Sequence, residues 1–186
     1  MKKTRLLASI LIAALILAAV PVAASAASYK APTQIKSGYK VDLNGDKKKE
    51  TITITEVPSN ISSATVKLQI GKSSISFEKN FGYAVYVGDI NKKDKYKEIF
   101  VVRDGFDVSS DCHIYRYTGK KIEKIKATFK YSGKTYKNKA FVTFDSYGVK
   151  NPIRLYGNGK IAFAQYDAKG KVKFQTLKLG SGFKLK

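Results

Sequence analysis

From residue 51 onward, polar and apolar side chains alternate along short segments separated by turn residues. Alternation with a period of two is typical of strands with one buried face, and no segment after residue 27 shows a convincing helical period. The alternating segments are 51–55, 65–70, 74–77, 83–87, 98–103, 113–117, 121–126, 140–144, 160–166 and 171–179. We therefore expect an all-β fold of antiparallel hairpins closed by glycine-containing turns such as Asn158-Gly159.

Part of this pattern repeats. An acidic loop that begins at Asp42 leads into the strand at 51–55, and 47 residues later a loop that begins at Asp89 leads into the strand at 98–103. A third unit of similar length has 141–148 at the loop position, without the acidic pattern. About 47 residues and four short strands are the size of one propeller blade. We expect one domain, 28–186, formed by a propeller-like array of about three four-stranded antiparallel units. Their expected bounds are 35–80, 81–130 and 131–186.

The first 27 residues have the composition of a secretory signal peptide. A basic start precedes the apolar stretch 6–20, and Ala24-Ser25-Ala26 fits a cleavage site. The apolar stretch is shorter than the roughly 20 residues that span a bilayer. We expect cleavage, a mature chain that is secreted or cell-wall associated, and no transmembrane segment in it. Cys112 is the single cysteine, which excludes a disulfide framework.

The expected mature chain carries 32 basic and 14 acidic residues, a formal charge of +18. Its arginines are Arg103, Arg116 and Arg154, and the other basic residues are lysines. Lysine lacks the planar fork that reads base edges, so specific nucleic-acid binding is not expected. The available partners outside a cell are anionic wall polymers, glycans and surface proteins, although the lysines could also serve only as a solubilising coat. We expect a monomer.

The two acidic loops resemble a known family. Asp42-x-Asn44-Gly45-Asp46-x-x-x-Glu50 is similar to the calcium loop of FG-GAP and VCBS-type repeats, which form blades of integrin-like β-propellers. The stretch 89–99, together with 114–122, resembles a subgroup of these repeats in exported proteins of Gram-positive bacteria. The resemblance implies a propeller fold. It implies no single activity, because the functions of the family range from adhesion to carbohydrate-associated modules.

The first loop has the oxygen donors that calcium prefers. The candidate ligands are the side chains of Asp42, Asn44, Asp46 and Glu50 and the backbone carbonyl of Lys48. We expect weak calcium binding of the extracellular kind, with a dissociation constant of roughly 0.1 to 1 mM. The alternative is an acidic turn without an ion, favoured by the repulsion from four nearby lysines.

The second loop has one inserted residue. Asp89, Asn91, Asp94 and Glu98 are its candidate ligands for a second calcium ion. The alternative is that the ammonium group of Lys93 takes the place of the ion and neutralises the carboxylates from within.

We expect no enzymatic activity. The alternative function is that of a polysaccharide hydrolase or lyase that uses the loop Asp104–Asp111 with its carboxylates Asp104, Asp107 and Asp111, since paired carboxylates can serve as acid and base. A polar, turn-rich loop explains the same residues. Cys112 and His113 are neighbours on an expected strand, so their side chains point to opposite faces and form no nucleophilic pair. The sequence thus predicts a secreted, non-catalytic, calcium-binding module for an anionic glycan, wall polymer or protein.

Overall fold

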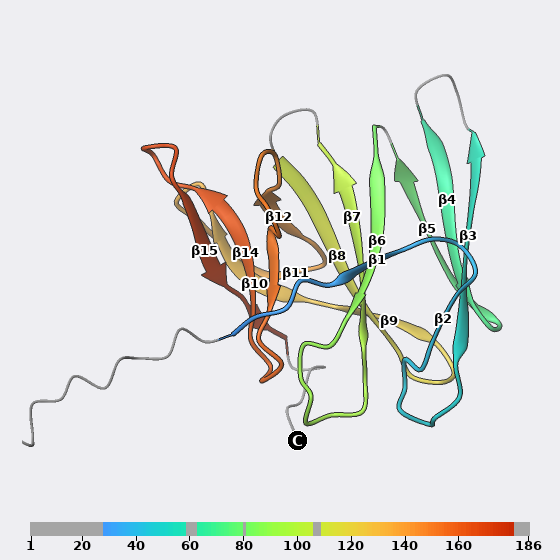
Figure 1. The fold of residues 1–186 in the computed structure, drawn as a ribbon. Coiled ribbons are helices and arrows are strands. Elements are labelled where there is room, and N and C mark those ends of the chain that lie inside the picture. Colours follow the sequence, from blue (N-terminus) through green and yellow to red (C-terminus); the bar gives the residue numbers. More distant parts are fainter. Residues whose placement is uncertain (1–27, 59–62, 80, 106–108, 181–186) are drawn as a thin grey trace, which may run out of the picture.

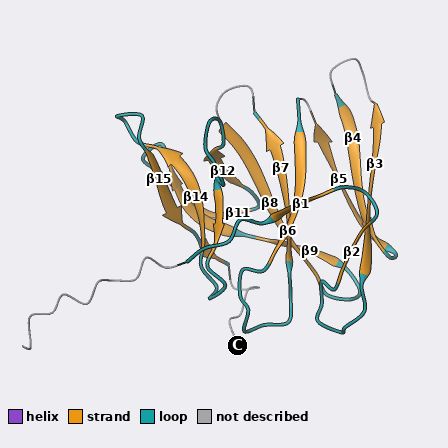
Figure 2. Cartoon of the chain, viewed as in Figure 1, coloured by secondary structure: helices purple, strands orange, loops and turns teal. Residues whose placement is uncertain are grey.

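The computed structural model describes residues 28–58, 63–79, 81–105 and 109–180. These residues form sixteen strands and no helix (Figure 2), which confirms the all-β prediction. The expected signal peptide lies outside the described residues. In the described part of the chain there is no helix long and apolar enough to cross a membrane.

The first sheet is a meander of consecutive hairpins. Its order is β2 (Tyr39–Val41), β3 (Glu50–Pro58), β4 (Ala64–Ile70) and β5 (Ser73–Lys79). Alternation gives it one apolar face, and its other face carries exposed polar residues such as Thr51, Thr53 and Lys67. The sheet therefore buries one side and presents the other to water.

The second sheet also contains a meander of consecutive hairpins, and further strands are added at both of its edges. Its order is β1 (Thr33–Ile35), β6 (Tyr83–Gly88), β7 (Glu98–Asp104), β8 (Ser109–Tyr117) and β12 (Val142–Asp145), and β9 (Ile122–Ile125) also pairs with β8. Val41 pairs with Glu50 in the first sheet as Gly88 pairs with Glu98 in the second. The two acidic loops are therefore equivalent connections, between β2 and β3 and between β6 and β7.

The last third of the chain differs from the expected third unit. It forms two three-stranded sheets: β11 (Lys134–Lys139), β10 (Ala127–Tyr131) and β16 (Lys178–Leu179), and β13 (Ile153–Leu155), β14 (Ile161–Tyr166) and β15 (Val172–Thr176). The expected loop at 141–148 contains β12, which joins the second sheet by pairing with β8. The expected strand 171–179 is divided between β15 and β16, which lie in different sheets. The expected third unit does not form because β12, β15 and β16 are short, and a short strand pairs with the sheet edge at which its apolar side chains become buried.

The second sheet lies between two apolar cores. On β7, Ile99 and Val101 belong to the core shared with the first sheet, whereas Phe100 and Val102 belong to the core shared with the last two sheets. Burial of both faces explains why 99–102 is a continuous apolar run. The β2–β3, β6–β7 and β13–β14 connections all emerge at one end of the sheets, at the bottom of Figure 1.

An N-terminal strap, residues 28–35, joins the second sheet to the sheet of β13–β15. Lys30 and Leu155 exchange two backbone hydrogen bonds of 2.8 Å, and β1 then pairs with β6. The Arg154 guanidinium lies 4.2 Å from the centre of the Tyr29 ring, which holds the start of the strap in place.

Candidate functional site

The first acidic loop is held by its own side chains. The Asp42 carboxylate accepts hydrogen bonds from the backbone N–H groups of Gly45 (2.7 Å) and Lys47 (2.9 Å). Both donors have positive φ values, 71° and 68°, which turn the backbone toward the carboxylate. Desolvation raises the pKa of Asp42, but these backbone hydrogen bonds outweigh it and the net shift is downward.

Glu50 closes this loop. Its carboxylate accepts hydrogen bonds from the Leu43 N–H (2.8 Å) and from Asn44 Nδ2 (3.0 Å), and the same Nδ2 donates to Asp46 Oδ2 (3.2 Å). The structure thus brings Asn44, Asp46 and Glu50 together, as the calcium prediction requires. The side chain of Asn44 places its amide nitrogen, rather than its oxygen, between the two carboxylates. A cation here would have to displace that nitrogen, and the carbonyl oxygen of the amide would have to turn inward.

The second loop is built around Arg116 of β8. Glu98 is fully buried and accepts a hydrogen bond from the Ile90 N–H (3.1 Å), as Glu50 does from Leu43. Arg116 Nη2 donates to Glu98 Oε1 (2.6 Å) and to Asp94 Oδ2 (3.1 Å). The guanidinium occupies the position that the predicted second calcium ion would need between these two carboxylates.

Lys93, the residue suggested as an internal cation, is exposed, and its backbone N–H bonds Asn91 Oδ1 (3.3 Å). The internal cation is instead Arg116, for which the spacing of the loop residues gave no indication. A signal was present: antiparallel pairing of β7 and β8 places Glu98 opposite Arg116. Continuing the β3–β4 register by two residues places Lys72, an exposed turn residue, opposite Glu50.

Burial controls the ionisation of Glu98. Desolvation raises the pKa of its carboxyl group to about 7, while the hydrogen bonds from Arg116 and Ile90 oppose the rise. The face of Tyr96 covers the guanidinium of Arg116, 4.4 Å from the ring centre. This site is thus a nearly dry ion pair with an aromatic cover.

The acidic loops lie side by side with a third loop, 156–160, between β13 and β14. The Lys97 N–H donates to the Leu43 carbonyl (3.0 Å), and the Lys92 N–H donates to the Gly157 carbonyl (3.0 Å). The turn after β8 adjoins the first loop, because a Cβ at Gly119 would lie 3.1 Å from Asn44. We call this surface the loop edge; it comprises 42–50, 89–98 and 156–160 with the turns 71–73 and 118–121.

The lysines of the loop edge are mostly exposed, and most of its acids accept hydrogen bonds within the edge. Asp42, Asp46, Asp94 and Glu98 accept hydrogen bonds from N–H groups of the edge. The exposed lysines of the edge are Lys47, Lys48, Lys49, Lys72, Lys92, Lys93, Lys95, Lys120, Lys121 and Lys160. Among the lysines that the structure describes, only Lys79, Lys121 and Lys173 form ion pairs with described residues. With eleven lysines against six acidic residues, the edge carries a net positive charge.

A cavity of about 320 Å³ opens beside the strap at this edge. Its lining residues include Lys30, Lys92 and Lys97, with Tyr39 and Tyr156 and one acidic residue, Asp89. Desolvation, and then the charge of Asp94, raise the pKa of Asp89, and a backbone hydrogen bond from Asn91 and the charges of Lys97 and Lys92 only partly oppose this rise. Asp89 Oδ1 is buried and has no hydrogen-bond partner among the described residues. We call this the lysine cavity; three cations and one carboxylate suit an anion that also carries hydroxyl groups.

The carboxylates proposed for the alternative enzyme do not converge. Pairing of β7 with β8 sets Asp104 opposite Ser110 and Arg103 opposite Asp111, so Asp104 and Asp111 lie on opposite faces of the sheet. Asp111 accepts a hydrogen bond from the Thr143 hydroxyl (2.9 Å) and lies 3.6 Å from Arg103 Nη2. Asp107 lies outside the described residues. A two-carboxylate mechanism has no support in this geometry.

Cys112 and His113 also lie apart, as predicted. Cys112 is buried in the core toward the last two sheets, and burial raises the pKa of its thiol. His113 packs against Tyr115 and Phe141 on the other face, and burial lowers its pKa to about 4. Neither residue is poised as a nucleophile or base for the other.

No family model, curated protein or solved structure matches this chain. In the part of the chain that the structure describes, no group of three or more His, Cys, Asp or Glu side chains is arranged to hold a metal ion. The resemblance to FG-GAP and VCBS-type repeats therefore stays a prediction based on the two loops, and so does calcium binding.

Proposed function

We propose that this chain is an exported, non-catalytic binding module that holds an anionic glycan or wall polymer at the cell surface through its loop edge. The observation that carries the proposal is the charge of the loop edge: ten of its lysines are exposed, and its lysines outnumber its acidic residues by eleven to six. A surface protein with an acidic face would be bound by the same lysines.

Lysine suits such a task because it is a flexible point charge that follows a polymer without reading its sequence. The lysine cavity adds a place where one unit of the polymer is oriented, with its anionic group near Lys30, Lys92 and Lys97. Hydroxyl groups of that unit would bond Asp89, whose buried oxygen has no partner in the described chain.

The remaining expectations form part of the same proposal. Two equivalent loops, at the same end of two antiparallel sheets that share a core, support a propeller-like arrangement of the FG-GAP/VCBS kind. Residues 1–27 would be removed on export. Calcium is proposed for the first loop alone, at Asp42, Asn44, Asp46, Lys48 and Glu50, because Arg116 already neutralises the second.

The test is a calorimetric titration of the protein with each of two polyanions, polygalacturonate and polyphosphate. The variant K30Q/K92Q/K97Q removes the cations of the lysine cavity, and K67Q/K134Q/K137Q removes equal charge from exposed positions on β4 and β11. We expect the first variant to bind at least tenfold more weakly and the second to change by less than about threefold, because exposed charges are screened over about 8 Å.

Equal losses in both variants would show a diffuse lysine coat and overturn the assignment to the loop edge. Affinity should also fall steeply as salt is raised. Binding that persists in 1 M salt would instead indicate a shaped, uncharged site.

A further inference from the structure

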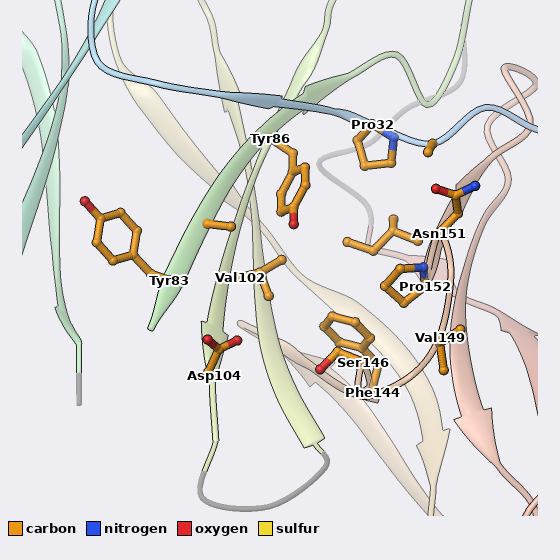
Figure 3. Close-up of a pocket in the computed structure, with 13 residues that line it drawn as sticks. Pro32, Tyr83, Tyr86, Val102, Asp104, Phe144, Ser146, Val149, Asn151 and Pro152 are labelled. Carbon is orange, nitrogen blue, oxygen red and sulfur yellow. The ribbon is translucent and has the colours of Figure 1, made fainter. Parts of the chain in front are cut away.

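A second cavity, of about 460 Å³, lies on the other side of the strap (Figure 3). It opens between the ends of β6 and β7 and the segment 146–153, and Ala31 and Pro32 of the strap cover it. Of its lining residues, only Ala31 is shared with the lysine cavity. The two cavities are therefore separate sites with one common wall.

The floor of this second cavity is apolar. Val102, Phe144 and Ile153 come from the core toward the last two sheets, and Pro32 of the strap and Pro152 add to the apolar lining (Figure 3). Such a surface can remove water from the body of a small ligand, and the volume suits a compact molecule. Apolar area alone would not select any particular ligand class.

The charge of the cavity lining determines which class of ligand it favours. Asp104 is the sole charged residue among those that line the cavity, in a chain whose lysines exceed its acids more than twofold. Asp104 is exposed and forms no ion pair with any described residue, since Arg103 of the same strand pairs with Asp111 on the opposite face. This carboxylate is therefore available to a ligand, and it would repel the anions that the loop edge attracts.

Further polar groups surround the same space. The phenol of Tyr86 points into the cavity from β6, with Ser146 and Asn151 across from it (Figure 3). Burial, and then the charge of Asp104, raise the pKa of Tyr86, so its hydroxyl stays protonated and can donate or accept a hydrogen bond. Tyr83 also lines the cavity, but its ring points away from the centre.

We propose that this cavity binds a compact organic amine. The ammonium group lies at Asp104, its remaining hydrogen atoms bond Tyr86 or Ser146, and the apolar body covers Val102 and Phe144. A cation is favoured over a neutral polyol because hydrogen bonds between a carboxylate and a full opposite charge are stronger than those to a neutral hydroxyl group. The same chemistry is offered by a free small amine and by the lysine side chain of a peptide.

The test compares probes of one shape and different charge. Benzylamine and benzyl alcohol are titrated into the protein and followed by NMR chemical shifts. We expect benzylamine to bind with a dissociation constant of about 1 mM, as ligands of this size do, and benzyl alcohol to bind at least tenfold more weakly. Asp104→Asn should abolish the difference between the probes, and K30Q/K92Q/K97Q should leave it intact.

Equal binding of the two probes to the wild type, or an unchanged preference in Asp104→Asn, would overturn the proposal. Asp104 is exposed, so its asparagine variant should fold, and an unchanged thermal midpoint verifies this. Nα-acetyl-lysine methylamide, as a third probe, distinguishes a peptide lysine from a free small amine as the ligand. Binding at least as tight as that of benzylamine assigns the site to a peptide lysine, and weaker binding assigns it to a free amine.

Discussion

Arg116→Met should destabilise this protein more than any other arginine substitution in it. The change leaves Glu98, which is fully buried, without the guanidinium that bonds it at 2.6 Å, and it also removes the contact of 3.1 Å to Asp94. Removing one partner of a buried ion pair costs about 3 to 5 kcal/mol. For a domain of this size, about 3 kcal/mol corresponds to a fall in Tm of roughly 6 to 12 °C.

The effect should depend on pH in a defined direction. Burial raises the pKa of Glu98 from 4.5 to about 7, so the folded state holds this proton more tightly than the unfolded state. The contribution of this group to stability is therefore fully present below about pH 4.5 and is lost as the pH rises through 7. Without Arg116 the pKa rises further, so the deficit of the variant should be largest at pH 7.5 and should shrink toward pH 5.

The assay is thermal unfolding by circular dichroism at pH 5 and pH 7.5, with Arg103→Met as the matched control. Arg103 lies on the neighbouring strand and pairs with Asp111 at 3.6 Å, and both side chains are about one-third exposed, 30% and 33%. Its loss should cost less than about 1 kcal/mol. The double variant Glu98→Gln/Arg116→Met should recover part of the lost Tm, because it no longer leaves the fully buried carboxylate of Glu98 without a cation. If the Tm of Arg116→Met falls no more than that of Arg103→Met, or falls equally at both pH values, the account of the buried pair is refuted.

Two further predictions concern the metal and the assembly. Calcium at ten times its dissociation constant should stabilise the wild type by about 1.4 kcal/mol, because a ligand that binds only the folded state adds RT ln 11 to the free energy of unfolding. The variant Asp46→Ala should gain no stability from calcium. A melting curve of the wild type that is unchanged up to roughly 10 mM calcium would exclude the first loop as a calcium site. In sedimentation experiments the protein should be a monomer, because the outer face of the first sheet carries Thr51, Thr53 and Lys67 rather than an apolar surface; a stable dimer would contradict this.

Local patterns in the sequence were sufficient for several features. The period-two alternation predicted an all-β chain, and most of the alternating segments became strands. The first acidic loop was also predictable, because the contacts of Asp42 with Gly45 and Lys47 span at most five residues. Such short-range hydrogen bonds form wherever the backbone can turn, whatever packs around them.

Tertiary structure decided which distant segments meet. The sequence showed two acidic loops but not that Arg116, eighteen residues beyond Glu98, supplies the cation for the second. It showed a strand near 140–144 but not that β12 would pair with β8. It contained Asp104 and Tyr86 but no sign that both would line one cavity together with residues of the strap. Pairing partners are chosen by the total apolar area that all the sheets bury together, and that quantity belongs to the whole chain rather than to any segment of it.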